Sequence, residues 1–223
     1  DRLQSEELVR QLHDMKDKGM GGAFIHSREG LETPYLSQEW MDNVAESIRC
    51  AGEEDLELWI YDEDKWPSGS VGGTVSAADP ERFTAKGLTL EILPADTQLP
   101  EEPAGIRIVG RYYANVEGRK LHSLADSREQ APEGSSQLVL RRELSTSSEW
   151  YNGFAPTDCL NPEATEKFLD MTHRRYYQRF QEHFGKTVKG FFTDEPNCCD
   201  FFSFFTPGRP WLPWTDGFAG YFL

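Results

Sequence analysis

The sequence has little basic charge and no long apolar run. Its 223 residues include 23 Lys and Arg against 38 Asp and Glu, which gives a net charge of -15. Because negative charge repels phosphate backbones and anionic lipids, we expect neither nucleic acid nor a membrane as a partner. No apolar run approaches the roughly 20 residues that span a bilayer. The composition is therefore typical of a soluble, acidic globular protein.

Cysteine is also scarce. The four cysteines are Cys50, Cys159, Cys198 and Cys199, and no CxxC pair indicates zinc. Reduced thiols favour a cytoplasmic location, while a periplasmic or secreted one stays open. No EF-hand spacing is present either, so we expect no metal and no other cofactor. Aromatic residues, in contrast, make up 13% of the chain, and such rings fill cores or stack on the C–H faces of sugars.

The first third of the chain alternates helix and strand patterns. Apolar residues at helical spacing predict helices over residues 5–19 and 37–52, with Ser5 and Ser37 as their N-caps. Short apolar runs predict buried strands at residues 22–25 and 56–61. This alternation with short turns is typical of a parallel sheet.

The pattern changes between residues 79 and 150. Three strand-like segments, at residues 89–93, 106–113 and 137–144, are separated by turns rich in Pro, Gly and acidic residues, which predicts an antiparallel β insertion. The alternation then resumes with one long helix that starts at Asn161 and ends at Phe184, and with a third buried strand at residues 188–193. The last stretch is predicted to be a loop, followed by a helix-like pattern from Phe218.

Polar side chains follow each of the three predicted parallel strands. They are His26, Arg28 and Glu29 after the first strand, Asp62, Glu63, Asp64 and Trp66 after the second, and Asp194 and Glu195 after the third. The carboxyl ends of parallel strands meet at one edge, where ligands bind in open sheets and in (β/α)8 barrels alike. The sequence therefore predicts a binding site there. For any single cluster, a solvated turn or a helix cap is the alternative.

Carboxylates gathered beside aromatic rings suit glycoside hydrolysis or the binding of a cation. Hydrolysis needs one carboxylic acid to protonate the leaving oxygen and one carboxylate on the other side of the sugar. Strand alternation points Asp194 and Glu195 to opposite faces, and Pro196 fixes the turn behind Glu195. We therefore expect Glu195 to be the catalytic acid, with a helix-capping role for the pair as the alternative.

The other polar residues are expected to bind substrate. This set contains His26, Arg28, Asp62, Glu63, Asp64, Trp66 and Asp194. The acids would accept hydrogen bonds from sugar hydroxyls, Trp66 would stack on a ring face, and Tyr151 and Asn152 would lie at the rim. His26 and Arg28 would bind hydroxyls or hold a carboxylate in place. A solvated acidic loop and a structural ion pair of Arg28 are the alternatives.

Four segments of the chain resemble a known family. They are GMGGAFIHSREGLETPYLSQEW, LELWIYDEDKWPSGSVGG, DCLNPEATEKFLDMTHRRYYQRFQEHFGKTVKGFFTDEP and PWTDGFAGYF. They look like a group of bacterial glycoside hydrolases similar to the α-L-rhamnosidases, over residues 3–78 and 150–222. The pair YDEDKWPSG and FFTDEP carries most of the specificity.

The resemblance implies an α/β fold, namely a partial (β/α)8 (TIM) barrel with an antiparallel β insertion. Residues 1–78 would form the first part of the barrel, residues 79–150 the insertion, and residues 151–223 the continuation of the barrel. In such barrels the general acid commonly follows the fourth strand, and that position is Glu195. The partner carboxylate, the remaining barrel and the accessory domains would belong to a longer chain.

The predicted function is the hydrolysis of glycosidic bonds by paired carboxylates, with Glu195 as general acid/base and a carbohydrate as substrate. A non-catalytic carbohydrate-binding module that uses the same aromatic and acidic lip is the first alternative. An acidic calcium-binding interaction domain is the second.

Overall fold

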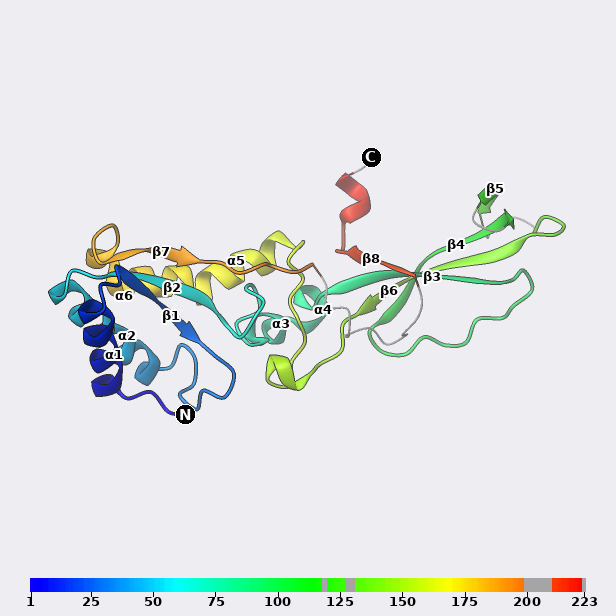
Figure 1. Cartoon of the computed structure of the whole chain (residues 1–223). Coiled ribbons are helices and arrows are strands. Elements are labelled where there is room, and N and C mark those ends of the chain that lie inside the picture. The colour runs from blue at the N-terminus through cyan, green and yellow to red at the C-terminus, as the bar shows by residue number, and fades with distance from the viewer. Residues whose placement is uncertain (118–119, 127–130, 199–209, 222–223) are drawn as a thin grey trace.

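The computed structural model describes residues 1–117, 120–126, 131–198 and 210–221. Figure 1 shows an elongated molecule with a parallel sheet and its helices at one end and an antiparallel sheet at the other. The parallel sheet has the strand order β1-β2-β7, and the antiparallel sheet has the order β5-β4-β6-β3-β8. Within the described ranges, no helix is long and apolar enough to cross a membrane.

The elements follow one another along the chain in the order of their labels within each type. The α-helices are α1 (Ser5–Asp17), α2 (Gln38–Glu53), α3 (Thr74–Ala78), α4 (Pro80–Phe83), α5 (Pro162–Met171) and α6 (His173–Phe180). The strands are β1 (Gly22–Ser27), β2 (Glu57–Asp64), β3 (Lys86–Pro94), β4 (Ile106–Glu117), β5 (Lys120–Asp126), β6 (Ser136–Leu144), β7 (Val188–Phe192) and β8 (Trp211–Trp214). The 3₁₀ helices are η1 (Glu149–Tyr151), η2 (Gln181–His183) and η3 (Phe218–Tyr221).

The N-terminal helices and strands lie where the sequence pattern predicts them. Ser37 caps α2 as expected, because its side chain accepts a hydrogen bond from the backbone N–H of Trp40. Ser5 does not cap α1; it is the first helical residue, and its Oγ lies 3.0 Å from Asn43 Oδ1. The apolar face of α2 is buried against the sheet, which makes this helix the centre of the N-terminal core.

One face of the parallel sheet is covered by helices, and the other carries aromatic rings. Leu58 and Ile60 of β2 are fully buried in the core that α2 and α6 share. On the open face, Phe24 is 53% exposed, and its ring lies 5.4 Å from that of Phe192 between the ring centroids. The parallel sheet therefore has one face in the core and an aromatic, solvent-facing surface on the other.

The predicted long helix before β7 is divided in two. It starts as expected, with the Asn161 side chain accepting from Glu163 N and with proline at the first helical position. At Thr172 the backbone leaves helical geometry, and the Thr172 hydroxyl donates to the carbonyl of Phe168. The interruption orients His173, the next residue, toward β2.

The antiparallel sheet contains two strands that the sequence pattern missed. The three predicted strands are present as β3, β4 and β6. The short strand β5 pairs with β4, and β8, which was predicted to be a loop, pairs with β3 at the edge of the sheet. Proline has no N–H to donate to a neighbouring strand and is tolerated at such an edge. Because proline is otherwise rare in strands, Pro213 led to the prediction of a loop here.

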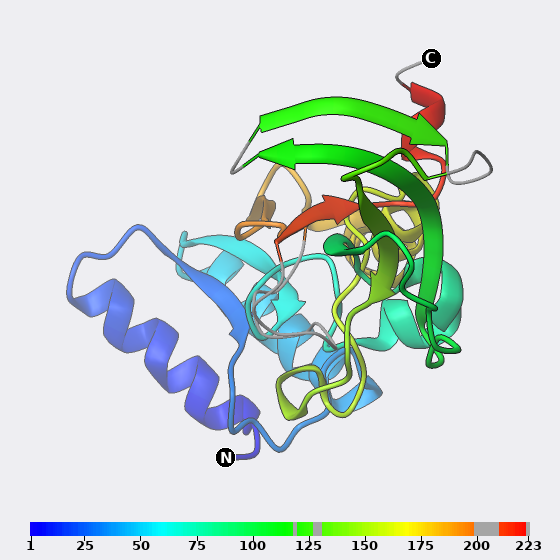
Figure 2. The same cartoon turned by 90° about the vertical axis from the view of Figure 1, so that its right-hand side faces the viewer.

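The expected partial (β/α)8 barrel is wrong. The structure has a mixed α/β fold in which, among the described residues, three strands are parallel and the other strands form a separate antiparallel sheet. Figure 2 shows this second sheet curling like half of a barrel. The physical reason lies in the connections, because the strands between residues 86 and 144 pair antiparallel with no helix between them in the described part of this segment, whereas a barrel of this kind needs a helix between successive strands.

A buried ion pair joins the start of β3 to the segment that precedes α5. Lys86 Nζ at the start of β3 is 3.1 Å from Asp158 Oδ2, and both side chains are fully buried. Thr215 Oγ1, which follows β8, also donates to Asp158 at 2.8 Å. Burial raises the pKa of Asp158, and the Lys86 ammonium opposes that shift. The pair thus fixes β3 and the chain after β8 to the segment that leads into α5.

Candidate functional site

The three parallel strands bring their carboxyl ends together as predicted. Ser27 at the end of β1 is in register with Asp64 at the end of β2, and its Oγ donates to Asp64 Oδ1 at 2.8 Å. After β7, the backbone N–H of Asp194 donates to Ser68 Oγ at 2.9 Å. Parts of the chain that are far apart in sequence therefore form one polar cluster at this edge of the sheet.

Glu63 is held inside this cluster. Its side chain is fully buried, and its Oε1 lies 2.8 Å from Nε2 of His26. The His26 ring stacks on Tyr61, with 3.8 Å between ring centroids and an interplanar angle of 9°. His26, held by Glu63 on one side and by Tyr61 on the other, supplies the hydrogen-bond partner that a buried carboxylate needs. Glu63 therefore positions His26 and does not itself reach solvent.

Asp62 is equally enclosed, on the other face of β2. It accepts from Ser68 Oγ and from Thr193 Oγ1, each at 2.5 Å, and it lies 3.3 Å from His173 Nε2. Its side chain is fully buried. Direct contact of Asp62 or Glu63 with a sugar remains a prediction. In the structure both acids lie below the surface and are occupied by internal partners.

Ser68 is the residue on which the cluster is centred. Its hydroxyl donates to Asp62, lies 3.3 Å from Glu63 Oε2, and accepts from the N–H of Asp194. Its own N–H donates to the Asp194 carbonyl. Because a single hydroxyl serves two buried carboxylates, we expect Ser68→Ala to lower the free energy of unfolding by about 1–3 kcal/mol, as measured by urea denaturation.

Ser70→Ala is the matched control for this prediction. Ser70 is also buried, but its hydroxyl accepts from only one neutral donor, the N–H of Thr157. We expect the loss at Ser70 to be clearly smaller. If both variants lose the same stability, Ser68 has no special role in holding the carboxylates.

Burial lowers the pKa of His173, and the Asp62 carboxylate opposes that shift. Because the unfolded state binds the proton more readily, the stability that neutral His173 provides is present above the ordinary value of 6.5 and is lost as the pH falls below it. We expect His173→Asn to reduce the drop in melting temperature between about pH 7.5 and pH 5.5. His183→Asn, at a more exposed histidine, should leave that drop unchanged.

Asp194 lies on the aromatic side of the cluster. Tyr61 donates its hydroxyl hydrogen to Asp194 Oδ2 at 2.8 Å. Burial, together with this hydrogen bond to Asp194, raises the pKa of Tyr61 to about 12. The phenol therefore stays protonated at neutral pH and acts as a fixed hydrogen-bond donor to the carboxylate.

Glu195 points away from these internal contacts. It has a positive φ of 43° and an exposed side chain, and its Oε2 accepts from Trp66 Nε1 at 3.2 Å. The Trp66 side chain is itself 42% exposed, and Trp150 Nε1 donates to the Trp66 carbonyl at 2.5 Å. We refer to Trp66, Trp150 and Glu195 together as the aromatic lip.

A cleft of about 450 Å³ lies beside the aromatic lip. Its polar lining is contributed by the ends of β1 and β2, by Asn152 and by α6, namely Arg28, Glu29, Asp64, Lys65, Asn152 and Arg175. Lys65 donates to Asn152 Oδ1 at 3.0 Å, and its Nζ lies 5.7 Å from the centre of the Trp150 ring. These contacts join the cleft, which we call the strand-end cleft, to the lip.

Asp64 is the predicted acid that reaches the cleft. It is half-buried and accepts from Ser27 Oγ and, at 3.1 Å, from Asn152 Nδ2. Gly72 makes this packing possible, because a Cβ at Gly72 would lie 2.5 Å from Asp64 Oδ2, and its φ of +59° favours glycine.

Arg28 is exposed and lines the same cleft, and the structure shows no ion pair for it among the described residues. The predicted structural ion pair of Arg28 is therefore not seen in this part of the chain. Its guanidinium is left facing the cleft.

The structure brings together all the predicted site residues, but in two layers. Asp62 and Glu63 form the buried layer, and the outer layer contains the half-buried His26, Asp64 and Asp194 and the exposed Arg28, Trp66 and Glu195. Sequence reasoning missed Tyr61, Ser68, Trp150 and His173. The one available signal was Ser68. It lies in a turn shortly after the acidic end of β2, where its hydroxyl can donate a hydrogen bond to the carboxylates.

Metal ligation finds no support in the residues that the structure describes. Within them, no group of three or more His, Cys, Asp or Glu side chains is arranged to hold an ion. The carboxylates that converge here are occupied by hydroxyl, imidazole and phenol donors instead. The site is thus built for hydrogen bonding.

Comparisons with known proteins identify no relative, since no family model, no curated protein and no solved structure matches the chain.

Proposed function

We propose that this protein is the catalytic part of a glycoside hydrolase that binds a carbohydrate in the strand-end cleft and uses Glu195 as general acid/base. The observation that carries the proposal is the contact between Trp66 and Glu195, which holds an exposed carboxylate against an exposed ring next in sequence to Lys65, a residue that lines the cleft. An aromatic face for the ring of a sugar beside an acid for its glycosidic oxygen is the arrangement that this chemistry requires.

The cleft has the size and the polar groups for a sugar. Its volume of about 450 Å³ falls in the range of small-molecule sites. Asn152 offers an amide and Asp64 a carboxylate to hydroxyl groups, and Arg28 and Arg175 offer guanidinium donors. Such a mixture of donors and acceptors suits a ligand whose hydroxyls both donate and accept.

Glu195 would protonate the glycosidic oxygen as the bond to the leaving group breaks. Hydrolysis also needs a second carboxylate, which attacks the sugar or activates a water. Three acids of the polar cluster are engaged elsewhere, because Asp194 accepts from Tyr61, and Asp62 and Glu63 are buried. The proposal therefore assigns the second carboxylate to none of them.

This engagement of the neighbouring acids favours a second candidate, a non-catalytic carbohydrate-binding module. A panel of aryl glycosides separates the two functions. The hydrolase releases the aryl group from at least one member of the panel, whereas the module binds sugars without releasing it. If the protein neither hydrolyses nor binds any sugar of the panel, both candidates fail.

A further inference from the structure

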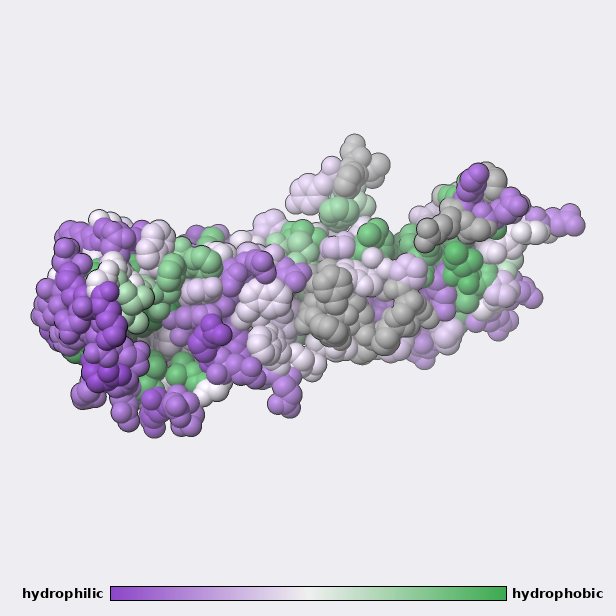
Figure 3. All heavy atoms as spheres, in the orientation of Figure 1, coloured by the Kyte–Doolittle hydropathy of each residue, from purple (hydrophilic) through white to green (hydrophobic). Residues whose placement is uncertain are grey.

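Cationic side chains gather in the strand-end cleft, although the protein as a whole is strongly acidic. Arg28, Lys65 and Arg175 line the cleft together with two acids, Glu29 and Asp64. The whole chain, in contrast, has 38 acidic against 23 basic residues, and in the orientation of Figure 3 its surface at the end with the parallel sheet is largely hydrophilic. The balance of charge in the cleft is therefore the reverse of the balance in the chain.

The acids of the cleft do not neutralise its arginines in the described part of the chain. Asp64 accepts from a hydroxyl and from a side-chain amide, both of which are neutral. Arg28 and Arg175 are exposed, and neither forms an ion pair with a described residue. Exposed arginines elsewhere behave differently, since Arg10 and Arg49 each contact two carboxylates. The guanidinium groups of the cleft are thus accessible to a negatively charged ligand.

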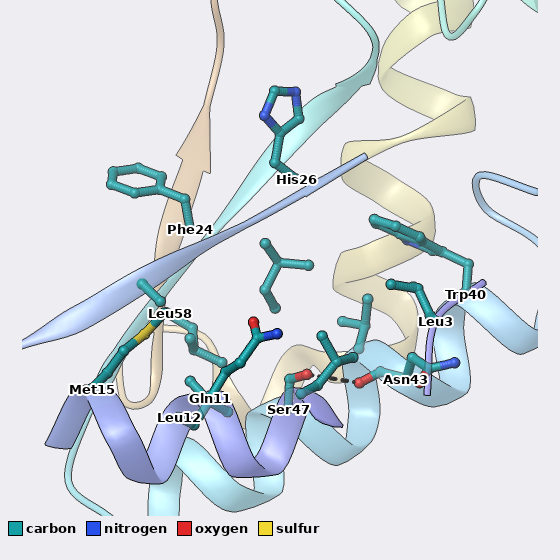
Figure 4. A pocket seen from close by; sticks show the side chains of 14 residues that line it. Leu3, Gln11, Leu12, Met15, Phe24, His26, Trp40, Asn43, Ser47 and Leu58 are labelled. Carbon is teal, nitrogen blue, oxygen red and sulfur yellow. Dashed lines mark hydrogen bonds between the residues drawn. The ribbon is translucent and has the colours of Figure 1, made fainter. Parts of the chain in front are cut away.

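Arg28 lies on the side of the sheet that carries the proposed acid. Figure 4 shows the His26 side chain on the side of β1 that faces away from α1, and Arg28 follows two residues later. Burial raises the pKa of Tyr61, and the positive charge of Arg28 is near enough to oppose that rise. Tyr61 in turn donates to Asp194, the neighbour of Glu195 in the sequence. A group held by Arg28 is therefore on the same face as the acid.

A carboxylate is the ligand group that suits such a cleft. The planar guanidinium presents parallel N–H groups that match the two oxygens of a carboxylate. Exposed charges act only over about 8–10 Å at physiological salt, so the cations of the cleft, and not the acids farther away, determine which ligand is attracted. The cleft of about 450 Å³ also offers the Asn152 amide to hydroxyl groups. A ligand that carries both hydroxyls and a carboxylate fits this set of groups.

We propose that the strand-end cleft binds an acidic sugar, namely a uronic acid residue, whose carboxylate pairs with Arg28, an inference that rests on the proposed carbohydrate function. Arg175 and Lys65 add positive charge to the same cleft. Asn152 and Asp64 bind the hydroxyl groups of the sugar, as they would in a neutral one. A neutral sugar lacks the group that the three cations attract, so the acidic sugar binds more tightly.

Matched pairs of sugars test this proposal. Glucuronic acid and glucose, or galacturonic acid and galactose, differ at one carbon, where the acid has a carboxylate and the neutral sugar a hydroxymethyl group. In calorimetric titrations, we expect the acid of at least one pair to bind at least about tenfold more tightly than its neutral partner, as one charge-assisted hydrogen bond allows. The methyl ester of that acid, which is neutral, should lose this preference.

The outcomes separate this proposal from the function on which it rests. If no acid binds more tightly than its neutral partner, or if acid and ester bind equally, the acidic sugar is excluded and carbohydrate binding stands. If no sugar of either kind binds, the proposed function and the acidic sugar fail together.

Two variants locate the carboxylate. Arg28→Gln keeps hydrogen-bonding capacity but removes the charge, and it should lower the ratio of the affinity for the acid to that for the neutral sugar at least about tenfold. Arg111→Gln makes the same exchange at an exposed position of β4, outside the lining of the cleft, and should leave the ratio unchanged.

A ratio that survives Arg28→Gln overturns the proposal. The same holds if Arg28→Gln lowers the melting temperature and leaves the ratio unchanged, because Arg28 would then pair with a carboxylate of the protein itself. If Arg28→Gln does not fold, the comparison of acid, ester and neutral sugar in the unmodified protein decides the question.

Discussion

Glu195→Gln is expected to lower the turnover of the most reactive aryl glycoside by about 10²–10⁴-fold, which is the contribution of a positioned general acid. Glutamine has nearly the same shape and can still accept the hydrogen bond from Trp66 Nε1, but it has no proton to give to the leaving oxygen. Since the Glu195 side chain is exposed, the fold should be unaffected. Steady-state kinetics, with circular dichroism as the check of folding, measures the effect.

Glu182→Gln is the matched control for this variant. Its side chain is 80% exposed on η2 and forms an ion pair with the neighbouring His183. The same exchange there should leave turnover within a factor of about two, as is usual for surface substitutions away from a site. Turnover near the level of the unmodified protein in Glu195→Gln would remove Glu195 from the role of acid.

Trp66→Ala is expected to weaken sugar binding by roughly tenfold or more, which is the usual cost of truncating a central aromatic contact. The variant removes the ring of the aromatic lip and also the N–H that holds Glu195 in place. Calorimetric titration measures the affinity. In kinetics, the loss should be visible in both KM and kcat, because the acid loses its orientation together with the sugar.

Tyr221→Ala controls for the general effect of removing an exposed ring. Tyr221 is 77% exposed and lies at the end of η3, outside the lining of the strand-end cleft. It should bind sugar like the unmodified protein. Equal losses in the two variants would mean that the sugar is held by scattered aromatic contacts and not at the aromatic lip.

The two variants together distinguish the two candidate functions. A hydrolase loses turnover in Glu195→Gln while it keeps its affinity for sugar. A binding module shows no turnover to lose, and Trp66→Ala alone affects it. The pattern of the two results thus identifies the function even where the natural sugar is unknown.

The meeting of polar residues at one edge of the parallel sheet was predictable because local sequence patterns indicate where strands end. Apolar runs at the cores of β1, β2 and β7, followed directly by polar residues, were sufficient to bring His26, Asp64 and Asp194 to one edge. The cap of α2 by Ser37 was likewise a local signal. A local sequence pattern indicates only interactions between residues that are close together in the sequence.

The division of the acids into buried and exposed ones was not predictable in this way. Asp62 and Glu63 are adjacent in an acidic run that is typical of a solvent-exposed turn, yet both are buried. Their donors come from distant parts of the chain, such as His26 and Thr193. The strand β8 was not predicted for the same reason, since its pairing with β3 is a contact between segments more than a hundred residues apart in sequence.

The central claim is that the strand-end cleft and the aromatic lip bind a carbohydrate. Calorimetric titration of the protein with a panel of sugars and aryl glycosides, repeated with Trp66→Ala, tests it most directly. We expect at least one sugar to bind and Trp66→Ala to weaken this binding by roughly tenfold or more, while Tyr221→Ala leaves it unchanged. Sugar binding that is unchanged in Trp66→Ala, or no binding across the panel, would contradict it.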